Sequence, residues 1–309
     1  MNTQSNTLPE SFGSRRTAPA ALSKTRPFYW SVRRELWEYR SIYLAPLAIA
    51  GAVLLGFLFV LTTIPNTMRT VSSLDPALQR TALAQPYDFA AALIMGAAFI
   101  VSFFYSLDTL YGERRDRSIL FWKSLPVSDL TTVLAKASIP LCVLPMVAFV
   151  ITFAVQSIML LLSSVVILGN GLSVTPLWTR LELYQTLLGL LYHLVTVHML
   201  WYAPIYAWLL LVSAWARRTP ILWAVLPPLA IVVFEKIAFH SSHFAALLQN
   251  RFGGGSEAGD SMQGNFPIQP GMHFTLGNFL SDPGLWLGLI VAVAFLAAAV
   301  RLRRYREPL

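Results

Sequence analysis

Residues 41–64 read SIYLAPLAIAGAVLLGFLFVLTTI and contain no charged side chain. A helix needs about 20 predominantly apolar residues to cross the hydrocarbon core of a bilayer. This run is long enough for one crossing. Over the chain of 309 residues, 56% are hydrophobic and 12% are charged, whereas a soluble domain carries about 25% charged residues. The sequence therefore predicts a membrane protein rather than a soluble globule.

Five further charge-free runs follow, at 89–107, 137–179, 183–216, 219–234 and 283–300. The run 137–179 is long, but Gly169-Asn170-Gly171 is a turn signal and Pro176 discourages a continuing helix, so we expect its helical part to end near Leu168. The predicted fold class is an all-α membrane protein with six transmembrane helices.

Lysine and arginine are concentrated in residues 15–40, 114–136, 217–218 and 301–306. Cytoplasmic loops of membrane proteins are enriched in these residues. Both termini are therefore expected to be cytoplasmic, with external loops near 66–86, 169–182 and 240–282. The net charge of +8 is explained by this topology and by contact with anionic lipids, without a nucleic-acid partner.

Residues 1–27 are rich in Ser, Thr, Pro and Arg and are expected to form a disordered cytoplasmic tail. Residues 28–40 have helical spacing and predict an amphipathic interfacial helix before the first span. Its apolar face would hold Phe28, Tyr29, Val32, Leu36 and Tyr39, and its polar face Ser31, Arg34, Glu35 and Glu38. The flanking residues are Trp30, Arg33, Trp37 and Arg40. Two roles stay open: an anchor for the first span, or an elbow that also packs on a cytoplasmic partner.

Residues 112–129, GERRDRSILFWKSLPVSD, lie between two apolar runs. We expect the second span to continue to residue 123, with Glu113 and Arg117 forming an exposed i,i+4 pair that contributes about 0.3 kcal/mol. Residues 119–122 are apolar but too short to span. Leu125-Pro126 would then end the helix, and Ser128 or Asp129 would cap the next one. Residues 108–136 therefore predict a protruding cytoplasmic elbow that binds a partner protein.

This segment resembles the coupling elbow of the membrane subunits of type 2 ABC transporters. The resembling residues are Glu113-Arg114, Ser118-Ile119-Leu120, Ser124-Leu125-Pro126-Val127-Ser128 and Lys136. The resemblance implies that 28–309 form one six-helix permease domain whose elbow docks an ATPase. The implied docking residues are Glu113, Arg114, Arg117, Ser118, Ile119, Leu120, Phe121, Ser124, Leu125 and Pro126.

The resemblance also implies the partners and the location. Two ATPase subunits and a second permease subunit, identical or related, would complete the transporter in a bacterial inner membrane. The chain has no phosphate-binding glycine-rich loop, so ATP and Mg are expected on the ATPase and no cofactor or metal on this chain. Export of a hydrophobic or amphipathic drug, peptide or lipid is the expected function.

Glu235-Lys236 lie about 16 residues into the fifth run, or about 24 Å along a helix, which predicts a position near the external interface. The two side chains would either reach the lipid headgroups or form a charged gate at the exit. The loop 239–282 contains Gly253-Gly254-Gly255 and is expected to be an external connection, either flexible or partly re-entrant.

Two other function classes are alternatives to a transporter. A membrane-embedded enzyme is disfavoured, because the sequence shows no nucleophile–base pair, and His193, His198, His240 and His243 do not form a zinc motif. A non-transporting membrane scaffold or sensor would use the same elbow to bind a different cytosolic protein.

Overall fold

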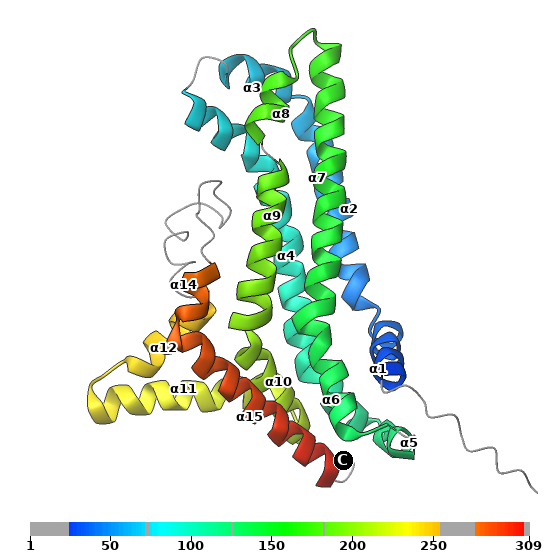
Figure 1. Cartoon of the computed structure of the whole chain (residues 1–309), viewed down its shortest axis with the longest axis vertical. Helices are drawn as coiled ribbons and strands as arrows, with labels where there is room; N and C mark the ends of the chain where they lie inside the picture. Colours follow the sequence, from blue (N-terminus) through cyan, green and yellow to red (C-terminus); the bar gives the residue numbers. More distant parts are fainter. Residues whose placement is uncertain (1–24, 72–74, 125–126, 182, 254–275, 306–309) are drawn as a thin grey trace, which may run out of the picture.

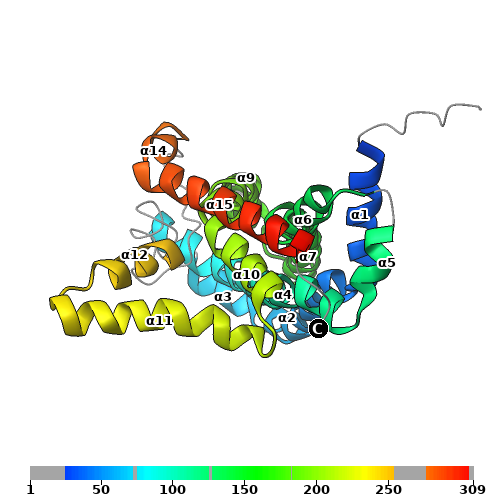
Figure 2. The same cartoon turned by 90° about the horizontal axis from the view of Figure 1, so that it is seen from below.

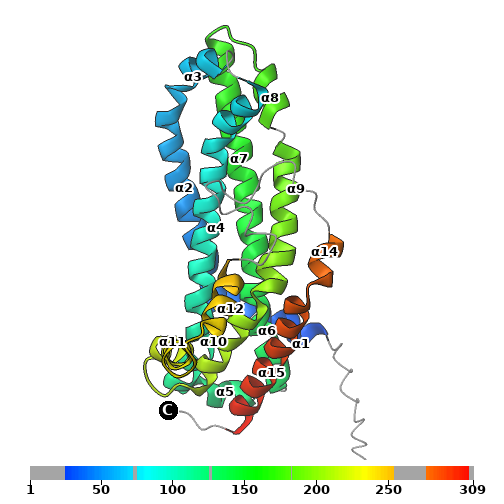
Figure 3. The ribbon, with the colours of Figure 1, turned by 90° about the vertical axis from the view of Figure 1, so that its left-hand side faces the viewer.

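The computed structural model describes residues 25–71, 75–124, 127–181, 183–253 and 276–305, and the regular elements in these ranges are all helices. Six helical segments are long and apolar enough to span a membrane, as the charge-free runs predicted. The helices α2, α4, α7 and α9 stand side by side (Figures 1 and 3). We call the two ends of this bundle the α3 end and the α5 end, after the short helices found there.

The elements in chain order, with η for π-helices, are α1 Thr25–Glu38, α2 Ser41–Leu61, α3 Ile64–Val71, α4 Pro76–Arg115, α5 Ser118–Ser124, α6 Asp129–Ser138, η1 Ile139–Val143, α7 Leu144–Gly169, α8 Thr175–Leu181, α9 Leu183–His193, η2 Leu194–Trp201, α10 Ala203–Trp215, α11 Pro220–Phe239, α12 His243–Phe252, α14 Leu276–Ser281 and α15 Pro283–Tyr305.

Several predicted boundaries are confirmed. The helix α2 begins at Ser41, at the start of the first charge-free run. The helix α7 ends at Gly169, one residue beyond the expected Leu168, and Gly171 follows with φ 69°. Glycine adopts this left-handed conformation without the steric cost of a Cβ atom. Most of the predicted tail, 1–24, lies outside the described residues, while Thr25–Pro27 belong to α1.

The second and third spans are much longer than a bilayer requires. The helix α4 has 40 residues, or about 60 Å, against a hydrocarbon core of roughly 30 Å. The third span, Asp129–Gly169, includes the π-helical turn η1, which contains Pro140 and is followed by Pro145 in α7. Proline has no N–H to donate, and a π-turn is one way in which a long helix accommodates that loss.

Small side chains let the central helices approach one another closely. Ala90 and Ala98 of α4 and Ala148 of α7 are buried in the core that α2, α4 and α7 share. A polar contact also links α7 to α4: the side chain of Gln156 donates a hydrogen bond to the carbonyl of Tyr87 at 3.1 Å. Small residues and interhelical hydrogen bonds are the usual means of association in membrane bundles, where the hydrophobic effect between helices is weak.

The helix α11 runs across the bundle axis near the α5 end (Figures 1 and 3). It is apolar and long enough to span a membrane, but only 6% of the residues in its most apolar 18-residue stretch are buried in the fold. Thr219 precedes it with φ 45°, so the chain turns sharply after α10. The expectation that Glu235-Lys236 lie about 24 Å up the bundle is therefore wrong, since α11 carries them sideways instead.

The loop 239–282 contains two helices, α12 and α14, while 254–275 lie outside the described residues. Arg251 of α12 stacks on Trp201 at 4.3 Å from the ring centroid and donates to the carbonyl of Gly284 at 2.9 Å. The part of this loop at 243–253 is thus helical and attached to η2 and α15, rather than a flexible connection.

Candidate functional site

The short helix α5 lies at one end of the bundle, beside α1 (Figure 2). The preceding helix α4 ends at Arg115, and Arg117 has the left-handed φ of 57°, so the chain changes direction before α5 begins. Ile119 is 2% exposed and attaches α5 to the fold, whereas Leu120 and Phe121 are 58% and 61% exposed. A helix of seven residues thus presents two large apolar side chains outward.

The expected break after α5 is partly described. Leu125 and Pro126 lie outside the described residues, and α6 begins at Asp129. The Oγ of Ser128 accepts a hydrogen bond from the N–H of Thr131 at 3.1 Å. Ser128, one of the two predicted residues, is therefore the N-cap of α6.

A buried network of charged side chains lies next to this segment, and Lys136 of α6 is at its centre. Lys136 is 0% exposed, and its Nζ lies 2.9 Å from Glu35 Oε1 and 3.1 Å from Glu113 Oε1. It also donates to Thr109 Oγ1 at 2.8 Å. An ammonium group taken out of water costs several kcal/mol unless such partners surround it.

The network extends from Glu113 to three other helices. Glu113 Oε2 accepts from Arg303 Nη2 of α15 at 2.9 Å, and Arg303 Nη1 donates to Asp129 Oδ1 at 2.7 Å. Arg34 of α1 donates to Glu113 Oε1 at 3.1 Å and pairs with its neighbour Glu35. We call this set the charge network; its members are Arg34, Glu35, Glu113, Asp129, Lys136 and Arg303. Three carboxylates and three cations tie α1, α4, α6 and α15 together.

Glu35 is the most surrounded carboxylate of the charge network. Besides Lys136, it accepts hydrogen bonds from Tyr105 Oη at 2.8 Å and Thr109 Oγ1 at 3.2 Å. Burial alone raises the pKa of Glu35, but the charges of Lys136 and Arg34 outweigh it and lower the pKa from 4.5 to about 2. Glu35 is therefore ionised at neutral pH in spite of its burial.

Aromatic contact links α5 to α1. The guanidinium carbon of Arg34 lies 4.0 Å from the ring centroid of Trp122, and Trp122 packs edge-on against Phe121 at 4.9 Å. A cation over an indole at this distance is attracted by the ring quadrupole, by about 0.5–2 kcal/mol depending on exposure. Arg34 thus connects the charge network to Trp122, which in turn contacts the exposed Phe121.

Three of the ten predicted docking residues do not face outward: Glu113 is 3% exposed, and Arg114 and Ile119 are each 2% exposed. Arg114 donates to the carbonyls of Ser213 at 2.9 Å and Ala216 at 2.5 Å, at the C-terminal end of α10. The predicted exposed Glu113–Arg117 pair is wrong, because α4 ends before Arg117 and Glu113 faces Lys136 and Arg303.

The other described docking candidates lie on or beside α5. Arg117 and Ser124 are exposed, and Ser118 is half-buried, with its hydroxyl 3.4 Å from the carbonyl of Glu113. Together with Leu120 and Phe121 they form the outer side of this segment, while Ile119 forms its inner side.

The helix α1 is oriented only partly as predicted. Val32, Leu36 and Tyr39 of the predicted apolar face pack against the core, and the flanking Trp30 and Trp37 are exposed. Ser31 and Glu35, expected on the polar face, are instead buried, because Glu35 pairs with the buried Lys136. Arg33 lies 5.1 Å from the Trp30 ring and 4.9 Å from the Trp37 ring, on the outer side together with the exposed Arg40.

Glu235 has a structural role that the gate hypothesis did not foresee. Its carboxylate accepts from the hydroxyl of Ser241 and from the backbone N–H groups of His243 and Phe244, each at 2.8 Å. These are the first N–H groups of α12, which have no partner within the helix. Glu235 therefore caps α12 where the chain turns from α11, and the adjacent Lys236 is exposed.

Sequence reasoning picked out Lys136 by resemblance but missed Glu35, which pairs with Lys136, and Arg303, which pairs with Glu113. The sequence did contain a signal of burial at these positions, because each charged residue lies within one helical turn of large apolar residues. Within the described ranges, no group of three or more His, Cys, Asp and Glu side chains is placed to hold a metal ion. The site thus combines a buried ionic network with two exposed apolar side chains on α5.

Comparison with known proteins finds no protein-family match, no matching curated protein and no matching solved structure.

We expect Lys136→Ala to destabilise the purified protein by about 3–5 kcal/mol, because it leaves Glu35 and Glu113 buried without their shared cation. Lys123→Ala is the matched control, since Lys123 is exposed and its effect should stay within about 0.5 kcal/mol. Thermal unfolding of both variants in the same detergent is the measurement. Equal unfolding midpoints would contradict the importance of the charge network.

The lowered pKa of Glu35 predicts a dependence of stability on pH. A carboxylate whose folded pKa is about 2, against 4.5 when unfolded, stabilises the fold above pH 4.5, and this contribution is lost as the pH falls towards 2. The unfolding midpoint of the wild type should therefore drop below pH 4.5. Glu35→Gln should be less stable at neutral pH and show a smaller drop; parallel curves for the two proteins would refute this assignment.

Proposed function

We propose that this chain is the membrane subunit of a type 2 ABC transporter, most simply an exporter, and that a separate ATPase docks on α5. The observation that carries the proposal is the exposed apolar pair Leu120 and Phe121, whose helix is attached to a buried charge network. Interface cores use aromatic anchors of this kind, and a few of them supply most of the binding energy.

The charge distribution supports a cytoplasmic location for the α5 end. The exposed basic residues Arg40, Arg115, Arg117 and Lys123 and the half-buried Arg33 gather there, and the last residues of α15 carry Arg301 and Arg304. Such an excess of Lys and Arg is typical of the cytoplasmic side of a bilayer. Both termini are then cytoplasmic, α1 lies along the inner membrane surface as the elbow helix, and the membrane is the bacterial inner membrane.

The charge network gives the docked ATPase a route to the spans. A movement of α5 displaces Trp122 and with it Arg34, which is bonded to Glu113 of α4 and lies on the helix that leads into α2. Arg303 connects the same carboxylate to α15. Closely packed elements move as rigid bodies rather than deforming, so ATP binding by the ATPase docked on α5 would tilt several spans together.

A second permease subunit completes the proposed transporter. The helix α11 supports this, because it is apolar, mostly exposed and directed away from the bundle (Figure 2). Two permease subunits and two ATPases would form the assembly, with ATP and Mg bound by the ATPases. The aromatic and apolar surfaces of the spans suit a hydrophobic or amphipathic cargo such as a drug, a peptide or a lipid.

We expect Phe121→Ala to weaken ATPase binding by about tenfold or more, since truncation of a buried interface aromatic typically costs more than 1 kcal/mol. The matched control is Phe59→Ala, because Phe59 is 80% exposed near the α3 end, away from the docking surface. Co-purification with a candidate ABC ATPase, followed by hydrolysis assays, is the measurement.

If Leu120 and Phe121 instead lie against lipid, the double variant Leu120→Ala/Phe121→Ala would keep wild-type ATPase binding and stimulation. That result would overturn the docking proposal. If the double variant instead loses binding to a cytosolic protein that has no ATPase activity, the scaffold or sensor hypothesis would be favoured.

The proposed orientation predicts the accessibility of single cysteines in a Cys142→Ser background. A cysteine at Asn170, which is exposed in the turn after α7, should react with an impermeant thiol reagent added to intact cells. A cysteine at Ser124, exposed at the end of α5, should react after the membrane is permeabilised and not before. The reverse pattern would place the α5 end outside.

A further inference from the structure

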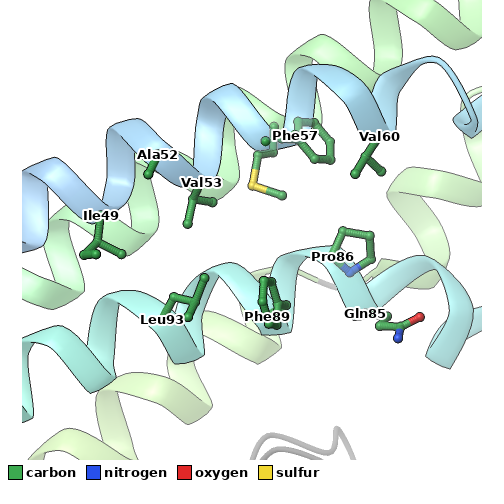
Figure 4. Close-up of a pocket in the computed structure, with 11 residues that line it drawn as sticks. Ile49, Ala52, Val53, Phe57, Val60, Gln85, Pro86, Phe89 and Leu93 are labelled. Atoms are coloured by element: carbon green, nitrogen blue, oxygen red, sulfur yellow. The ribbon is translucent and has the colours of Figure 1, made fainter.

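A lateral groove lies between α2 and α4, in the half of the bundle towards the α3 end. It has a volume of about 500 Å³ and is lined by Ile49, Ala52, Val53, Gly56, Phe57, Val60, Gln85, Pro86, Phe89, Leu93 and Met159. Figure 4 shows the α2 residues along one wall and the α4 residues along the other. Met159 of α7 is 1% exposed and closes the floor. This volume is in the range of small-molecule binding sites.

Two small residues of α2 keep the groove open. A Cβ atom placed on Gly56 would meet no atom within 4 Å, so there is free space beside this position. Ala52, one turn away, also lines the groove. The groove therefore extends along the interface of the two helices and is not a gap beside a single residue.

The length and level of the groove fit one leaflet of a bilayer. From Ile49 to Val60, α2 rises about 16 Å, which is close to half of the roughly 30 Å hydrocarbon core. These residues lie inside the charge-free run 41–64. The opposite wall begins at Gln85, just before the charge-free run that starts at Phe89. The groove thus extends from the boundary of the hydrocarbon core towards its middle.

The two ends of the groove differ in polarity. The inner end is formed by aliphatic residues such as Ile49 and Leu93 (Figure 4). At the outer end lies the amide side chain of Gln85, and Pro86 has no N–H to offer the carbonyl of Ala82, four residues earlier in α4. An apolar channel with hydrogen-bonding groups at one end matches an amphiphile with one chain inside and its polar group outside.

We propose that this groove is a binding site for one acyl chain of a bilayer phospholipid, with the lipid headgroup at the Gln85 end. A bilayer lipid is the occupant because the groove opens sideways, on the face that the spans present to the membrane, and is as long as one leaflet. The site does not depend on the transporter function, since it is formed by one chain without a partner.

Native mass spectrometry of the detergent-purified chain tests the proposal, with a phosphatidylglycerol or phosphatidylethanolamine carrying a diazirine in one acyl chain as the probe. We expect one retained phospholipid for each wild-type chain, and photolabelling of the peptides that contain Phe89 and Met159. Gly56→Leu fills the free space and should abolish both signals. Gly51→Leu is the matched control, because Gly51 is also open to substitution and does not line the groove.

Ala52→Leu is the second test if Gly56→Leu lowers the yield of folded protein, and it should also abolish retention. Equal retention in the wild type, Gly56→Leu and Ala52→Leu would overturn the site. A free single-chain fatty acid that labels the groove while the phospholipid probe does not would overturn the assignment of its occupant.

Discussion

The position of Lys136 constrains the rest of the α5 end. Its ammonium group has no contact with solvent and lies 2.9 Å from Glu35 and 3.1 Å from Glu113. A buried ion that loses a partner costs several kcal/mol, so these three groups must come together in the fold. They come from α6, α1 and α4, and their meeting fixes where three helices end relative to one another.

The second carboxylate oxygen of Glu113 extends this constraint to the C-terminal part of the chain. It binds Arg303, so the last turns of α15 must reach the place where α1 already lies. Because the charges in the network balance, no further ion is needed to neutralise it. Ile119 is the inward-facing side chain of α5, so the outer surface of this helix carries the apolar Leu120 and Phe121 together with the exposed Lys123.

Much of the fold could be predicted from local sequence, and little of the site could. The lack of charge over 41–64 locates a span, and a turn at Gly169-Asn170-Gly171 follows from backbone preferences; both signals lie within one segment. The inward direction of Glu35 depends instead on Lys136, 101 residues away. An amphipathic pattern shows that a helix has two faces, but the burial of its polar face required partners that no local pattern reveals. The direction of α11 could not be predicted for the same reason. It depends on where α10 ends, and that end is held by Arg114 of α4, which is distant in sequence.

The charge network and the lipid groove share the helix α4. The helix α4 carries Glu113 near one end and Phe89 near the other, and it is α-helical without interruption between them. The third span differs, because the π-helical turn at Ile139–Val143 separates its charged end from the part that forms the groove floor. A tilt imposed on Glu113 would therefore reach the α4 wall of the groove directly, whereas the floor at Met159 would move less. The width of the groove is then coupled to the α5 end through the difference between a continuous helix and an interrupted one.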